Sequence, residues 1–242
     1  MTTISTKQTG VFTASLTRQE YRHEIKYEAD YDKAMTLKHR VAGVLAADEY
    51  TDRDQSYIVK SVYFDTPYNN DYLAKELGLQ YRQKVRLRTY GDGGVYRLEI
   101  KSKNGQLATK YSATLSQEEA KRVLSGDYSP LAAREDATSL YIYHQLMTNA
   151  YRPLLTVFYK RYAYTLPGTD LRLTFDTDIR YGSDPFAVIS GRQPMGIATY
   201  KTVIELKYGS FAPNWLSDMI LARGIAASEN SKYNTAFINI FD

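Results

Sequence analysis

Acidic and basic side chains are paired two residues apart in three short segments of the sequence. Each segment has the form Glu-aliphatic-Lys, and the three are Glu24-Ile25-Lys26, Glu99-Ile100-Lys101 and Glu205-Leu206-Lys207. In a β-strand the first and third residues lie on the same face, about 7 Å apart. Each segment would therefore present a carboxylate beside an ammonium group on one side of a strand.

A fourth segment carries a row of cations with the same alternation. Arg82, Lys84, Arg86 and Arg88 would share one face of a strand, where like charges repel one another unless an anion lies among them. Lysine offers a phosphate a point charge, arginine offers a bidentate fork, and carboxylates bind Mg²⁺ or Mn²⁺ through oxygen. These residue types together are suited to binding a polyphosphate and its metal. An antiparallel sheet with one solvated face shows the same alternation, and the pattern alone favours that simpler interpretation.

Alternating side chains predict the strands that would hold these residues. Gly91-Asp92-Gly93-Gly94 joins two of the strands as a hairpin turn. There are eight such segments: Tyr21–Glu28, Tyr57–Phe64, Tyr81–Tyr90, Val95–Lys103, Ala108–Leu115, Leu154–Leu166, Leu171–Asp178 and Thr199–Tyr208.

Three helices are predicted among the strands. Ser116-Gln117-Glu118-Glu119 has the spacing of a capping box and opens a short helix that ends near Gly126. Thr138–Asn149 has apolar residues at helical spacing, and Trp215–Arg223 is a helix stopped by Gly224. The fold class is therefore α+β, with an antiparallel barrel or a two-sheet sandwich as the arrangement of the strands.

Composition excludes several classes of protein. The 242 residues include no cysteine, which excludes disulfides, thiolate nucleophiles and cysteine-ligated metal sites. The net charge of +4 is too small to indicate nucleic-acid binding. No signal peptide and no apolar run near the ~20 residues of a membrane span is present, so we expect a cytoplasmic protein without a transmembrane segment. Residues 1–19 are expected to form a loose arm before a single domain over residues 20–242.

The motifs of this chain resemble the VTC domain of polyphosphate polymerases, within the triphosphate tunnel metalloenzyme superfamily. They run in order from about residue 20 to the end, so the resemblance covers nearly the whole chain. Singly none of them is specific, but together they are. The matching motifs are Arg22-His-Glu24-Ile-Lys26-Tyr27, Val62-Tyr63-Phe64-Asp65-Thr66, Arg82-Gln-Lys84-Val-Arg86-Leu-Arg88, Leu98-Glu99-Ile-Lys101, Tyr159-Lys-Arg161-Tyr, Arg172-Leu-Thr174-Phe-Asp176, Ile204-Glu205-Leu-Lys207-Tyr208 and Ser231-Lys232-Tyr233.

The resemblance implies an eight-stranded antiparallel barrel, flanked by a few helices, whose charged interior forms a tunnel. It also implies that ATP and Mn²⁺ or Mg²⁺ bind there, and that the γ-phosphoryl group is added to a growing inorganic polyphosphate chain with release of ADP. An ordinary eight-stranded barrel is filled by its own side chains, and filling one with charge is costly unless water or a counter-ion shares the space. A polyanion meets that requirement.

Residue roles follow from the resemblance by position. Lys26, Arg86 and Arg88 are expected to be catalytic, with Lys26 at the transferred phosphoryl group or the incoming chain end. Glu205 is the expected metal ligand, supported by Glu24 and Glu99. The remaining substrate-binding residues are Arg82, Lys84, Lys101, Lys110, Arg161, Arg172, Lys207, Ser231 and Lys232.

Two features of the sequence depart from the wider family. Arg22 stands where hydrolase and cyclase members have the first glutamate of a Glu-x-Glu-x-Lys strand, which favours the polymerase branch. Glu229 lies where fungal members carry another basic residue, which places the handling of the chain at that tunnel mouth in doubt. The fungal domain is also accompanied by membrane helices and an inositol-phosphate sensor domain, neither of which this chain shows.

Two other functions fit the same residues. One is a metal-dependent triphosphatase on the same fold, and the other is a non-catalytic module that binds polyphosphate or single-stranded nucleic acid. A nucleic-acid platform expects aromatic rings and cations on one face. The 23 tyrosines are expected largely on the faces opposite the cations or at strand ends, which argues against nucleic acid as a partner.

Overall fold

The computed structural model describes residues 23–49, 55–91, 94–105 and 107–241. The expected loose arm at residues 1–19 lies outside the described residues, as do Arg22 and the centre of the Gly91–Gly94 turn.

One antiparallel sheet contains all eight of the predicted strands. Three short strands join them: β2 (Ala46–Ala47), β9 (Gly196–Thr199) and β11 (Ala226–Ala227). Strand β2 pairs with β7, and strand β9 pairs with β8. The main sheet runs in the order β11-β1-β10-β8-β7-β3-β4-β5-β6. Its eight long strands are β1 (His23–Ala29), β3 (Ser56–Asp65), β4 (Tyr81–Tyr90), β5 (Tyr96–Asn104), β6 (Leu107–Leu115), β7 (Arg152–Thr165), β8 (Arg172–Gly182) and β10 (Thr202–Tyr208).

Helices lie between the strands at the predicted places and at further ones. The three predicted helices correspond to α3, α5 and α7, and the Ser116 capping box is present, with the Ser116 hydroxyl accepting from the Glu119 amide. Helices α1, α2 and α8 and two single turns were not predicted. The helices within the described residues are α1 (Tyr31–Val41), α2 (Asn70–Glu76), α3 (Gln117–Leu124), α4 (Ser129–Ala132), α5 (Ala137–Thr148), α6 (Ala187–Ser190), α7 (Asn214–Leu221) and α8 (Lys232–Phe241).

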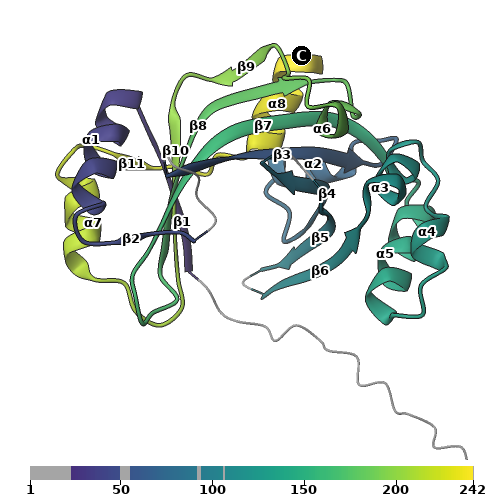
Figure 1. The fold of residues 1–242 in the computed structure, drawn as a ribbon, viewed down its shortest axis with the longest axis horizontal. Helices are drawn as coiled ribbons and strands as arrows, with labels where there is room; N and C mark the ends of the chain where they lie inside the picture. Colours follow the sequence, from purple (N-terminus) through teal and green to yellow (C-terminus); the bar gives the residue numbers. More distant parts are fainter. Residues whose placement is uncertain (1–22, 50–54, 92–93, 106, 242) are drawn as a thin grey trace, which may run out of the picture.

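The sheet is strongly curved. Figure 1 shows β7 and β8 arching from the side of the molecule that carries α1 and α7 to the side that carries α3, α4 and α5. The strand pairings among the described residues form a path with β11 at one end and β6 at the other. The antiparallel sheet of an α+β fold is thus confirmed, and its closure into a barrel stays a prediction.

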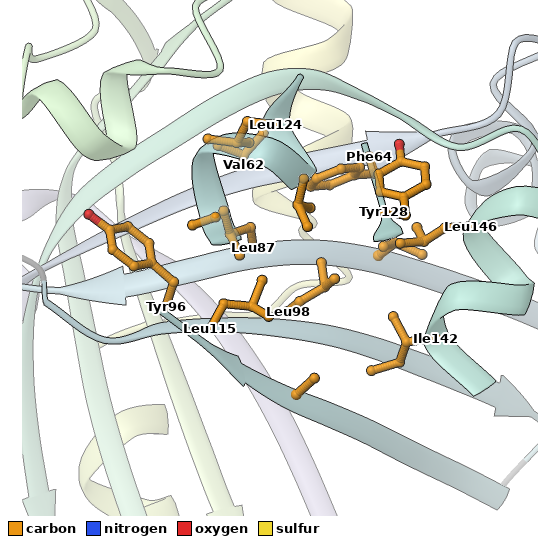
Figure 2. Packing of buried hydrophobic residues seen from close by; sticks show 14 of the residues in the cluster. Val62, Phe64, Leu87, Tyr96, Leu98, Leu115, Leu124, Tyr128, Ile142 and Leu146 are labelled. Carbon is orange, nitrogen blue, oxygen red and sulfur yellow. The ribbon is translucent and has the colours of Figure 1, made fainter. Parts of the chain in front are cut away.

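Apolar clusters cover one face of this curved sheet. Under α3–α5, Val62, Leu87 and Leu98 from the strands meet Ile142 and Leu146 from α5 (Figure 2). A second cluster lies under α1 and α7, where the strand residues Phe175 and Ile204 pack with helix residues. Both clusters bury side chains that alternate with the charged residues along the strands. The helices therefore hold the outer face, and the charged residues point to the opposite, inner face.

Helix α8 is packed differently, because it lies against part of the inner face. Tyr233 and Phe237 of α8 share a buried cluster with Val59, Tyr63 and Tyr159 from β3 and β7. The helix also contacts α2, β8 and β9. The start of α8 is therefore held at the edge of the charged region. None of the helices in the described part of the chain has the length and hydropathy needed to cross a membrane.

Candidate functional site

The strand register places those predicted site residues that lie on strands on one continuous face. Residues directly opposite each other in neighbouring strands point to the same side of a sheet. The register therefore connects the two ends of the sheet through a series of facing pairs: Lys110 and Lys101, Lys101 and Lys84, Glu99 and Arg86, Arg86 and Tyr63, Tyr57 and Arg161, Arg161 and Asp176, Arg172 and Lys207, Glu205 and Lys26, and Lys207 and Glu24.

A buried ion-pair cluster lies on β4–β6. The Arg86 guanidinium contacts the Glu99 carboxylate at 2.7 Å, and the Lys110 ammonium contacts the other oxygen of Glu99. Glu99 is only 4% exposed. Burial acts to raise the pKa of Glu99, but Arg86 and then Lys110 outweigh it and hold this pKa well below its usual range. Glu99 therefore stays ionised and fixes the position of Arg86.

A second cluster joins β7, β8 and α8 around Asp176. Arg161 donates to both oxygens of Asp176 at 2.6 and 2.8 Å, and the Lys232 ammonium lies 2.7 Å from the same carboxylate. Asp176 is completely buried. Burial alone would raise the pKa of Asp176, yet the two cations lower it. Asp176 was not among the predicted site residues, although its motif contained it, because the pattern could not show that it orients two site cations.

Lys207 links two carboxylates on adjacent strands. Its ammonium lies 3.1 Å from Glu205 and 3.5 Å from Glu24, and Lys26 lies 3.4 Å from the other oxygen of Glu24. Burial favours a raised pKa at Glu205, but Lys207, Glu24 and Arg161 together hold this pKa well below its usual range. Glu205 and Glu24 are therefore the two carboxylates that the structure brings together.

The two lysines opposite each other on β4 and β5 have lowered pKa values. Burial, with Lys26 and Arg86 nearby, lowers the pKa of Lys84 to about 8, and its ammonium donates to the Ser231 hydroxyl at 2.9 Å. Arg86, then burial and Lys207, lower the pKa of Lys101 to about 7. Lys207 on β10 lowers the pKa of Lys101 on β5, and Glu24 on β1 acts to raise it. The curved sheet therefore brings its two halves together around one charged region.

The other predicted arginines lie at different points of the face. Arg88 is buried and donates to the Ser61 hydroxyl and the Tyr159 hydroxyl, each at 3.1 Å. Arg172 donates to the Tyr57 hydroxyl at 2.9 Å and also to Asp48, so a carboxylate outside the predicted set holds it. Arg82 lies at the start of β4, opposite Lys103.

A pocket of about 370 Å³ opens beside Ser231, between α2, α8 and β1. Its lining includes Glu28, Glu76 and Glu229, and Glu229 pairs with Lys75 at 3.1 Å. This side of the charged face therefore also carries carboxylates.

Some tyrosines also lie on the charged face, although others, such as Tyr96 and Tyr164, lie in the outer clusters as expected. Tyr63 on β3 faces Arg86 on β4. The Lys84 ammonium lies 5.9 Å from the centre of the Tyr63 ring. The Lys232 ammonium lies 5.0 Å from the centre of the Tyr159 ring. The reason is α8, whose own aromatic side chains pack against this part of the inner face. Aromatic rings and cations thus share a face, and their separation no longer argues against a nucleic-acid platform.

A buried hydrogen-bond network supports the end of the face near α2 and α8. Asp65 accepts from the Tyr233 hydroxyl and from backbone amides at the start of α2. Asp71 accepts from the Tyr151 hydroxyl at 3.0 Å, and burial together with Asp65 raises the pKa of Asp71 to about 8. The sequence motif contained Asp65, but its partner Tyr233 comes from a distant segment and left no local signal.

Comparison with known proteins identifies the family of the chain. No match was found among curated proteins. Among solved structures, the chain is similar to a candidate adenylate cyclase from Bacillus halodurans, with 11% identity, a TM-score of 0.54, and coverage of 93% of this chain and 98% of that one. It is also similar to a candidate adenylyl cyclase from Hippeastrum, described as having a dominant triphosphatase activity, with 14% identity, a TM-score of 0.57, and coverage of 89% and 95%. The family model of the VTC domain matches residues 21–241, and the chain therefore belongs to the VTC domain family.

Proposed function

We propose that this chain transfers the γ-phosphoryl group of ATP to a growing inorganic polyphosphate chain and releases ADP. The observation that carries the proposal is the continuous inner face on which cations from β4, β5, β7, β8 and β10 converge, with those of β4 and β7 the most buried. Such a concentration of partly buried positive charge is costly unless an anion shares the space. Membership of the VTC family and the motifs quoted above support phosphate as that anion.

The proposed roles follow the geometry. Arg86 is fixed by Glu99 and Arg88 by Ser61, so both can present a pre-oriented guanidinium to the β- and γ-phosphates. Lys84, Lys101 and Lys110 form a row across β4, β5 and β6, and they would follow the polyanion along the face. Lys26 lies beside the two carboxylates and is proposed to contact the transferred group. The other proposed phosphate contacts are Arg82, Arg161, Arg172, Lys207, Ser231 and Lys232.

The carboxylates fit a divalent cation that arrives with its substrate. Among the described residues there is no group of three or more His, Asp or Glu side chains placed to hold a metal. Mg²⁺ is commonly held by one or two carboxylates, with waters and substrate phosphates as its other ligands, and Glu205 and Glu24 can supply that number. Glu99 is held by Arg86 and Lys110 on β4 and β6, away from the Glu205–Glu24 pair, and its supporting role stays a prediction. Bound Mn²⁺ or Mg²⁺ would neutralise charge that develops on the phosphate oxygens.

The chain's own residues would act by positioning and by charge stabilisation. A terminal oxygen of the polyphosphate chain attacks the γ-phosphorus, and the bond from that phosphorus to the β–γ bridging oxygen breaks. The electron pair leaves with ADP, so the protein needs to form no covalent bond. Fixed cations such as Arg86 stabilise the charge that the transition state spreads over the phosphoryl oxygens.

Replacing Glu205 with glutamine is expected to weaken the binding of the divalent metal. The change removes one of two available carboxylates but keeps the size of the side chain. We expect the Mn²⁺ concentration for half-maximal activity to rise about 10- to 100-fold, the range in which changes around a metal site alter affinity. The measurement is the rate of ADP release over a metal titration. Glu118→Gln on the exposed surface of α3 is the control, and an unchanged metal requirement in Glu205→Gln would exclude Glu205 as a ligand.

The protein is expected to take up protons near neutral pH when it binds a polyanion. The pKa of Lys101 is lowered to about 7, and a bound polyphosphate would raise it again. Binding therefore protonates Lys101, and affinity falls as pH rises above about 7. Calorimetry of tripolyphosphate binding at pH 7.5, in buffers of different ionisation enthalpy, measures this uptake. Lys101→Arg stays charged and should take up fewer protons, and equal uptake by both proteins would contradict the assignment.

A triphosphatase is the second candidate function, because the Hippeastrum protein that shares this fold is described as having that activity. Product stoichiometry with ATP and Mn²⁺ separates the two. A polymerase releases ADP in excess of orthophosphate, whereas hydrolysis of the terminal phosphate releases the two in equal amounts. A module that only binds polyphosphate would retain the polymer and release neither product.

A further inference from the structure

Tyr63 occupies the middle of the charged face, and no role has been assigned to it so far. It lies on β3 directly opposite Arg86 and is 4% exposed. Its ring stacks on the Tyr233 ring, with the centres 5.2 Å apart and the planes 28° from parallel. The ring is therefore clamped by α8, and its position on the face does not depend on its hydroxyl.

The surroundings of the Tyr63 hydroxyl are cationic. Burial favours a raised pKa for this phenol, but Arg86, Lys84, Arg88 and Lys232 outweigh burial and lower the pKa of Tyr63 to about 8. These cations come from β4 and α8.

Carboxylates offset this positive charge only in part, because Glu99 pairs with Arg86 and Asp176 pairs with Lys232, each at 2.7 Å, and the net effect of the cations on the pKa of Tyr63 is still to lower it. Asp65, two residues along β3, accepts hydrogen bonds from the Tyr233 hydroxyl and from the amides of α2. Asp71 on α2 accepts from the Tyr151 hydroxyl. The residue facing Tyr63 from β7 is Leu155, which carries no charge.

We propose that the Tyr63 hydroxyl donates a hydrogen bond to a phosphate oxygen of the polyanion held by Arg86 and Lys84. This inference rests on the proposed function, because it needs phosphate on this face. A phosphate oxygen is an acceptor, so it requires the protonated phenol. In the free protein the four cations favour the phenolate, whereas a bound polyanion neutralises them. By linkage, binding of polyphosphate and retention of this proton strengthen each other.

A phenol contributes direction rather than charge to such a site. The cations attract any polyanion, but a hydroxyl on a clamped ring can donate to a phosphate oxygen at one place only. Tyr63 is thus proposed to fix the register of the phosphate chain relative to Arg86. Tyr63→Phe keeps the ring and its stacking on Tyr233, so the substitution removes the hydrogen bond and preserves the packing.

The test is a pH titration of the tyrosinate ultraviolet difference absorbance, recorded without metal, with and without saturating tripolyphosphate. The wild-type protein should show a tyrosinate transition near pH 8 that tripolyphosphate moves to higher pH. Tyr63→Phe should lack that transition and bind tripolyphosphate about 10- to 100-fold more weakly, the usual size for a hydrogen bond to a charged group.

Tyr90 provides the matched control. It lies at the end of β4, is 40% exposed, and its pKa is also lowered, mainly by Arg88 against the effect of burial. Tyr90→Phe should lose only its own transition and keep the one that responds to tripolyphosphate.

Two results would overturn the proposal in distinguishable ways. If the wild type binds tripolyphosphate but the responsive transition persists in Tyr63→Phe, or does not move on binding, the role of Tyr63 is wrong and the proposed function stands. If the wild type does not bind tripolyphosphate at all, the proposed function fails and this inference fails with it.

Discussion

Replacing Arg86 with alanine is expected to lower the rate of phosphoryl transfer by about 10²- to 10³-fold, the usual cost of losing one pre-oriented transition-state donor. Arg86 is 13% exposed at its side chain and is held by Glu99 at 2.7 Å, so its guanidinium is in place before substrate arrives. The measurement is kcat/KM for ATP, from ADP release with Mn²⁺.

The control for Arg86 must separate charge on the inner face from charge in general. Arg122→Ala removes an arginine from α3, where Arg122 pairs with Asp127 and is 55% exposed, and it should leave kcat/KM unchanged. A second variant, Arg86→Ala with Glu99→Gln, removes the buried carboxylate that would otherwise lose a partner. If the double variant recovers wild-type activity, Arg86 serves only to neutralise Glu99, and its proposed contact with phosphate is wrong.

Replacing Asp176 with asparagine is expected to produce the largest loss of stability. Asp176 is completely buried and neutralises both Arg161 and Lys232. Removing one partner of a buried ion pair costs about 3–5 kcal/mol, because the remaining charge is left uncompensated. The measurement is the free energy of unfolding from urea denaturation.

Asp178 is the matched control, two residues further along β8. It pairs with Arg180 at 2.8 Å, but its side chain is 56% exposed. Asp178→Asn should therefore cost at most about 1 kcal/mol. Tripolyphosphate should stabilise Asp176→Asn more than the wild type, since the variant has more uncompensated positive charge. A loss of stability no larger at position 176 than at 178 would contradict the proposed role of the buried carboxylate.

The strands could be predicted from the sequence because each has a buried apolar face. Ile100 alternates with Glu99 and Lys101, and Leu206 alternates with Glu205 and Lys207. Periodicity could not decide which set points inward. That choice depends on the helices that cover the apolar side, and those contacts join distant segments of the chain.

Helix α8 illustrates what the prediction lacked. Tyr233, Ala236, Phe237 and Ile240 have the spacing of a helix with one apolar side, so the sequence carries a local signal for α8. The aromatic cluster on the inner face depends on this helix, which is the reason for Tyr63 and Tyr159 to lie there. The contacts of Asp65 with Tyr233 and of Asp176 with Lys232 could not be predicted from local spacing, since these partners are far away in sequence.

The fate of the γ-phosphate tests the central claim most directly. Purified protein is incubated with Mn²⁺ and with ATP labelled at either the γ- or the α-phosphate, and the products are resolved on a gel. We predict that the γ-label enters a ladder of polyphosphate while the α-label stays in ADP, and that Lys26→Ala and Arg86→Ala each reduce the ladder. Appearance of the γ-label only as orthophosphate, or an undiminished ladder in both variants, would contradict the proposed function.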